Sequence, residues 1–152
     1  TLFPYTTLFR SEVFTNNQDA KTQDWDDTRD FVELYNDSDK TIDLSGFSMN
    51  DDALNPDKKY TFPAGTSIPA KGFLTFEVFK KNPNGPVFGL GKGGDWVFLY
   101  DKKGVLISEM EAPAFEDHEI YSVGRKIDGA DKIVVFTEVS ENGSNNNKAV
   151  KR

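Results

Sequence analysis

Apolar and polar residues alternate in short runs along this chain, and turn-forming residues separate the runs. Phe31-Val32-Glu33-Leu34-Tyr35 is one such run, and residues 73–79 and 95–100 form two more. Alternation with a period of two is typical of β-strands, because successive side chains point to opposite faces of a sheet. The Gly, Pro, Asn and Asp residues between the runs supply the backbone angles of tight turns. The pattern therefore predicts an all-β fold, an antiparallel β-sandwich.

Strands are expected wherever a short apolar run is bounded by turn residues. Along the chain these runs fall at residues 12–14, 31–36, 42–44, 47–50, 59–62, 72–79, 95–100, 105–109, 119–124 and 133–137. No stretch has the period of an amphipathic helix. Asp101-Lys102-Lys103-Gly104 separates two runs and predicts a hairpin turn, with Gly104 in a left-handed conformation. Residues 15–29 are polar and acidic, which favours a long loop.

The length of the chain, 152 residues, suits one domain, and we expect the strands to form it between residues 12 and 140. Residues 1–11 resemble the translation of a sequencing adapter and are expected to be a non-native segment outside the fold. Residues 141–152 are rich in Asn and Lys and are expected to be a flexible polar tail or linker.

The charge balance and the missing cysteine exclude several classes of partner and chemistry. Lys and Arg number 18 against 25 Asp and Glu, a net charge of −7. Phosphate backbones repel such a chain, so nucleic acid is not an expected partner. Without cysteine there are no disulfides, thiolate metal sites or cysteine nucleophiles. No apolar run reaches the ~20 residues of a membrane-spanning helix, so no transmembrane segment is expected.

Candidate catalytic residues are few. His118 is the one histidine, and within Glu116-Asp117-His118-Glu119 a solvated residue is more typical than a catalytic one. The run Gly89-Leu90-Gly91-Lys92-Gly93-Gly94 has the spacing of a dinucleotide motif, but phosphate binding needs a helix N-terminus after it and the pattern predicts a strand. No catalytic residue is therefore assigned, and the chain is not expected to be an enzyme.

Acidic residues gather in two of the expected loops. They are Asp24, Asp26, Asp27 and Asp30 in one loop and Asn50, Asp51, Asp52, Asn55 and Asp57 in the other. Calcium takes six to eight oxygen ligands from loops of this kind, although the spacing is not that of an EF-hand. The preferred interpretation is solvated acids that form turns, with no assigned metal ligand; a calcium site is the alternative.

Several motifs occur in the order and spacing of a known family. They are Asp30-Phe31-Val32-Glu33-Leu34-Tyr35-Asn36, Asp43-Leu44-Ser45-Gly46-Phe47, Phe62-Pro63-Ala64-Gly65-Thr66, Leu90 to Leu99, and Ser122-Val123-Gly124-Arg125. With them the chain resembles the lamin tail domain over roughly residues 12 to 147. The resemblance implies an immunoglobulin-like β-sandwich. It also implies that Leu44 and Phe47 belong to the core and that Gly46 and Gly65 lie in turns.

The resemblance implies a class of function as well. Bacterial lamin tail domains look like noncatalytic binding, adhesion or spacer modules of secreted or surface proteins, which implies an extracellular or cell-surface location. The alternative is an accessory domain of a larger hydrolase or nuclease whose catalytic domain lies outside this sequence. No catalytic residues come with the family.

The expected strand at residues 95–100 carries apolar side chains on both faces. Val97 and Leu99 point to one face, and Trp96, Phe98 and Tyr100 point to the other. A sandwich buries one face of each sheet, so the second set is exposed or covered by other segments. The family resemblance assigns Val97 and Leu99 to the core. Trp96, Phe98 and Tyr100 then form the candidate surface for a protein or polysaccharide partner; the alternatives are that loops cover the rings or that the register is inverted.

Overall fold

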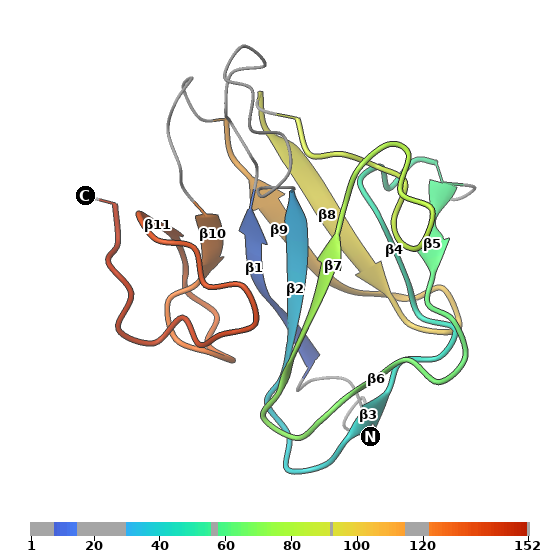
Figure 1. Cartoon of the computed structure of the whole chain (residues 1–152), viewed down its shortest axis with the longest axis horizontal. Coiled ribbons are helices and arrows are strands. Elements are labelled where there is room, and N and C mark those ends of the chain that lie inside the picture. Colours follow the sequence, from blue (N-terminus) through green and yellow to red (C-terminus); the bar gives the residue numbers. More distant parts are fainter. Residues whose placement is uncertain (1–7, 15–29, 56–57, 92, 115–121, 152) are drawn as a thin grey trace.

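The computed structural model describes residues 8–14, 30–55, 58–91, 93–114 and 122–151 (Figure 1). Its secondary structure consists of short strands. They are β1 (Leu8–Phe14), β2 (Phe31–Asn36), β3 (Ile42–Asp43), β4 (Ser48–Asn50), β5 (Tyr60–Thr61), β6 (Ser67–Ile68), β7 (Phe73–Glu77), β8 (Asp95–Tyr100), β9 (Leu106–Ala112), β10 (Ser122–Arg125) and β11 (Ile133–Phe136).

Two antiparallel sheets are packed against each other. The first sheet has the strand order β11-β10-β1-β2-β7, and the second sheet has the order β5-β4-β8-β9. The pair β3-β6 forms a separate ribbon at one end. In Figure 1, β9 crosses behind β1 and β2 and β8 crosses behind β7, so the two layers are visible one behind the other. The expected all-β antiparallel fold is confirmed, and it is consistent with an immunoglobulin-like sandwich.

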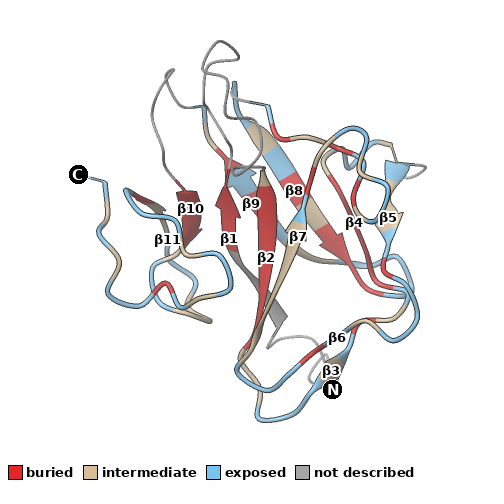
Figure 2. Cartoon of the chain, viewed as in Figure 1, coloured by how far each residue is buried: buried red, intermediate tan, exposed pale blue. Residues whose placement is uncertain are grey.

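The core lies between the sheets and uses the inward-facing residues of both. It includes Val13, Val32, Leu34 and Val123 from the first sheet and Met49, Val97, Leu99 and Met110 from the second. Buried residues follow β1, β2, β4 and much of β8 in Figure 2. Because packing of these side chains fixes the twist and register of both sheets, it also fixes where the outward-facing side chains lie.

The turn residues implied by the family resemblance occupy the expected conformations. Leu44 and Phe47 are buried in the core. Gly46 has φ +79° and Gly65 has φ +88°, left-handed values that favour glycine. Between them, the Ser45 hydroxyl accepts a hydrogen bond from the Gly65 amide at 2.9 Å. The two turns are therefore joined directly.

The hairpin expected at residues 101–104 connects β8 to β9. Gly104 has φ +79°, and the Asp101 carboxylate accepts hydrogen bonds from the amides of Lys103 and Val105 at 2.8 and 3.0 Å. The strand after this turn continues to Ala112, three residues beyond its expected end at residue 109. The extension adds Glu111 to Glu109 as a residue opposite β8, which matters for the site described below.

The first strand begins inside the segment that the sequence suggests is non-native. Backbone pairing places Leu8 opposite Asn36 and Phe9 opposite Tyr35, with a register shift between Arg10 and Glu12. Backbone hydrogen bonds use no side-chain atoms, so residues of many types can extend an existing strand. The long loop expected at residues 15–29 lies outside the described residues.

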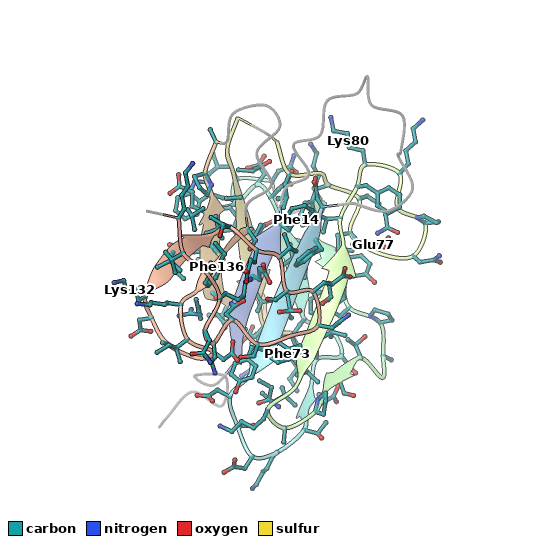
Figure 3. The ribbon with its side chains drawn as sticks, turned by 60° about the vertical axis from the view of Figure 1, so that its left-hand side comes forward. Phe14, Phe73, Glu77, Lys80, Lys132 and Phe136 are labelled. Carbon is teal, nitrogen blue, oxygen red and sulfur yellow. The ribbon has the colours of Figure 1, made fainter. Side chains whose placement is uncertain are left out.

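The C-terminal segment, residues 138–151, differs from the expected flexible tail. It folds back over the first sheet, as Figures 1 and 3 show. At its end, the Lys151 amide donates to the Val135 carbonyl at 2.8 Å and the Thr137 amide donates to the Ala149 carbonyl at 3.0 Å. The segment therefore covers the edge of β11. The composition of this segment is polar, like that of a linker, because polar rather than apolar side chains attach it to the sheet.

Candidate functional site

Strand β8 presents a row of aromatic side chains on the outer face of the second sheet. Val97 and Leu99 are fully buried, as expected, so the alternating residues must point outward. Trp96 is 41% exposed and Phe98 is partly buried. The two rings lie side by side, with centroids 6.1 Å apart and planes inclined by 13°. We call this outer surface, from Trp96 to Tyr100, the aromatic face.

Two acidic residues of β9 flank the exposed rings. Glu111 pairs directly opposite Trp96, and Glu109 pairs directly opposite Phe98. Directly opposed residues on one face of an antiparallel pair have Cβ atoms about 4.5–5.5 Å apart. Both glutamates are exposed. The aromatic face therefore combines apolar ring surface with two carboxylates.

Tyr100, the third expected surface residue, is buried with 7% exposure. The Lys59 ammonium lies over its ring, 3.6 Å from the centroid. Burial raises the pKa of the Tyr100 hydroxyl above its ordinary value. The sequence left open whether another segment covers the ring and does not show which one, because Lys59 comes from the approach to β5, which is not adjacent to β8 in the sheet. The accessible part of the aromatic face is therefore Trp96 and Phe98.

The two other features considered in the sequence are His118 and the glycine run at residues 89–94. His118 lies outside the described residues, as does Lys92 of the glycine run. The glycine run leads into β8, as the sequence predicts, so no helix N-terminus follows it. Instead, the Gly91 amide donates to the Asp95 carboxylate at 3.1 Å and the Leu90 amide donates to Asp30 at 3.0 Å. This loop is held by acids rather than shaped around a phosphate.

The two acidic loops are described only in part. Asp24, Asp26, Asp27 and Asp57 lie outside the described residues. The Asp30 carboxylate accepts a hydrogen bond from the Leu90 amide, and the Asp52 carboxylate accepts one from the Leu54 amide at 2.9 Å. Within the described ranges, no three His, Cys, Asp or Glu side chains are grouped to hold a metal ion. Asp52 therefore has a local role in its turn, and Asp30 binds the glycine run at a distance of 60 positions along the chain; the calcium hypothesis stays a prediction.

A second polar arrangement, on the outer face of the first sheet, was not anticipated from the sequence. Glu12 of β1 and Glu33 of β2 are both fully buried. The Asn142 amide donates to the Glu33 carboxylate, and the Thr75 hydroxyl donates to it at 3.0 Å. The sequence did contain a sign of this arrangement. Glu33 lies between Phe31 and Tyr35 on one face of its strand, where a charged residue needs a partner.

The partner of Glu12 is a lysine near the other end of the chain. Lys148 Nζ lies 2.8 Å from Glu12 Oε1, and their side chains are 7% and 0% exposed. The same ammonium donates to the Ser140 hydroxyl at 2.9 Å and lies over the Phe136 ring, 4.1 Å from its centroid. The Ser140 hydroxyl also donates to Glu12 at 2.7 Å. These groups attach the C-terminal segment to β1, and they are absorbed by the fold rather than open to a ligand.

Comparison with known proteins identifies one family. Residues 5–113 match the Lamin Tail Domain, from the start of the chain to just past β9. Strands β10 and β11 and the C-terminal segment lie beyond the matched residues. A search of curated proteins found no match. Among the described residues, no helix is long and apolar enough to cross a membrane.

The family match and the fold agree. The match covers more than two thirds of the chain, and the two packed antiparallel sheets are those of an immunoglobulin-like sandwich. The family is usually noncatalytic, and no catalytic family was detected for this sequence. This chain belongs to the lamin tail domain family.

Proposed function

We propose that this domain is a noncatalytic binding module of a bacterial secreted or surface protein, used for adhesion or targeting. Its contact surface is the aromatic face at Trp96 and Phe98. The observation that carries the proposal is the exposure of Trp96 beside a second ring, on a sheet whose other face already forms the core. Large rigid aromatics supply much contact area at a small cost in conformational entropy.

The position of the rings on a central strand supports this function. β8 pairs with β4 on one side and with β9 on the other, so the backbone beneath Trp96 and Phe98 is held from both directions. A site on a paired strand is preorganised, and binding then orders fewer groups. The rings are therefore suited to bind a protein or polysaccharide without rearrangement of the sheet.

Serine substitution of the two rings tests the proposal. Trp96→Ser with Phe98→Ser should leave the circular dichroism spectrum unchanged and lower the melting temperature by only a few degrees, because Trp96 is exposed and Phe98 is only partly buried. Wild-type protein should be retained by at least one probe of a panel of short peptides, cellulose, chitin and peptidoglycan, and the double variant should not.

Two results would contradict the proposal. Collapse of the fold in the double variant would show that the rings are structural. Equal retention of the double variant and wild-type protein on every probe would show that another surface binds. Val105→Ser with Ile127→Ser serves as the control, because both are exposed apolar residues and neither belongs to the aromatic face.

A further inference from the structure

The acids beside the exposed rings define the chemistry that the aromatic face presents. Glu109 and Glu111 are exposed and directly opposite Phe98 and Trp96. Among the described residues, no Lys or Arg forms an ion pair with either glutamate. Two carboxylates and two near-parallel rings thus lie together on one accessible surface. Both kinds of group attract cations, the first by charge and the second by the ring quadrupole.

The protein itself supplies an example of a cation bound on this surface. Lys59 lies over Tyr100, at the end of the same row of rings, at 3.6 Å from the ring centroid. A lysine therefore lies over the Tyr100 ring, whereas within the described ranges no lysine lies over the ring of Trp96 or Phe98. Indole is a better cation acceptor than phenol or benzene. The exposed end of the row is thus better suited to a cation than the end that already holds one.

We infer that the aromatic face binds a basic segment of a protein partner, an extended chain with Lys or Arg at alternating positions. This inference rests on the proposed function and names its partner class. Residues two apart in an extended chain are separated by about 6.6 Å, close to the 6.1 Å between the ring centroids. Each basic side chain then contacts one ring and one carboxylate. The net charge of −7 favours the encounter with a basic partner.

A saccharide uses the same rings but not the same charges. Its hydroxyls can bond to neutral amides as well as to carboxylates, so replacing Glu with Gln should change saccharide binding little. A basic peptide loses two charge interactions in that replacement. Glu109→Gln with Glu111→Gln therefore separates the two partner classes while keeping the shape of the surface.

Fluorescence titration at low salt gives the test. Trp25→Phe makes Trp96 the single indole of the full chain. The probes are acetyl-Ser-Lys-Ser-Lys-Ser-Lys-Ser-amide, the same peptide with norleucine for lysine, and cellohexaose. We expect saturable binding of the lysine peptide alone, weakened by added salt. In Glu109→Gln with Glu111→Gln the affinity should fall about tenfold. Glu138→Gln with Glu141→Gln, two exposed acids of the C-terminal segment, is the matched control and should bind as before.

The outcomes separate this inference from the proposed function. If the norleucine peptide or cellohexaose binds as well as the lysine peptide and the Glu109/Glu111 variant binds unchanged, the basic-segment inference is overturned while the aromatic face remains a binding surface. If the lysine peptide gives no saturable change, the inference is also overturned. If the peptide binds equally well to Trp96→Ser with Phe98→Ser, read by calorimetry, both the inference and the proposed function fail.

Discussion

The two sheets carry apolar residues on their outer faces but cover them differently. On the first sheet, residues 138–151 lie across β1 and β2, and Glu12 and Glu33 have no exposed surface. On the second sheet, Trp96, Glu109 and Glu111 are accessible. The same alternation of residues thus leads to a buried face in one case and to a face that is open at Trp96 and β9 in the other. Whether an outer face is buried depends on whether another part of the chain has polar groups that can bond to it.

The cover of the first sheet is electrostatic as much as apolar. Glu12 would be costly to bury alone, and Lys148, Ser140 and the sheet around them offset that cost. On the second sheet, Lys59 covers Tyr100 alone. The contacts of the two faces thus differ: a lysine lies over the ring of Tyr100, whereas a segment of several polar residues lies over Glu12 and Glu33.

Removal of the C-terminal segment, which covers the first sheet, should cause the largest loss of stability. A chain ending at Thr137 loses the cover of β1 and the pairing along β11. We expect a loss of roughly 4 kcal/mol or more of folding free energy, a fall of at least about 10 °C in melting temperature, with increased binding of a hydrophobic dye. Calorimetry of the truncated and full chains measures this. An unchanged melting temperature would show that the segment adds nothing to the fold.

Loss of the one ion pair between Lys148 and Glu12 should cause the next largest loss of stability. Lys148→Met leaves the Glu12 carboxylate buried without its cation, which costs roughly 3–5 kcal/mol. Adding Glu12→Gln should recover part of the loss, because the uncompensated charge is then gone. Denaturant unfolding of both single variants and the double variant gives the coupling energy. The exposed Lys132→Met is the control, and similar losses in Lys132→Met and Lys148→Met would contradict the assignment.

Two positions in β8, Leu99 and Trp96, sharpen the contrast between inner and outer faces. Leu99→Ala opens a cavity in the core and should cost about 2–5 kcal/mol. Trp96→Ala removes a larger side chain but should cost less than about 1 kcal/mol, because the ring is already partly in water. Unfolding in urea compares them. A larger loss for Trp96→Ala would mean that a segment covers the aromatic face.

The smallest predicted effect concerns Asp51, in the turn after β4. Burial, with Asp95 as a lesser cause, raises the pKa of the Asp51 carboxyl. The folded state therefore holds this proton more strongly than the unfolded state, and stability falls as the pH rises through that range. Asp51→Asn should raise the melting temperature at pH 7 by about 1 °C, and the gain should disappear below about pH 4. A gain that persisted at pH 3, or that equalled that of the exposed Asp39→Asn, would rule out the titration of Asp51 as the cause.

The sequence predicts well those features that depend on the backbone period alone. Alternation in β8 is enough to put Val97 and Leu99 on the face opposite Trp96, because a strand has only two faces, and the family resemblance assigned Val97 and Leu99 to the core. The family resemblance likewise placed Leu44 and the Gly46 turn. These features need no knowledge of distant contacts.

Features that depend on distant polar contacts could not be predicted in the same way. Tyr100 is covered by Lys59, and Glu12 is covered by Lys148. Neither lysine belongs to an apolar pattern, and a polar partner for a buried acid has no period in the sequence. Asn and Ser within residues 140–147 therefore resemble a linker although they lie on a sheet. Glu33, between Phe31 and Tyr35, was the one available sign that the outer face would need a polar cover.

The contact between Glu12 and Lys148 also sets an order of events during synthesis. The two residues are 136 positions apart, so the pair cannot form until nearly the whole of this sequence has left the ribosome. Strands β1, β2 and β7 can pair earlier, and their uncovered outer face is then open to chaperones or to other nascent chains. Folding yield in the cell should therefore depend on how soon the last few residues emerge.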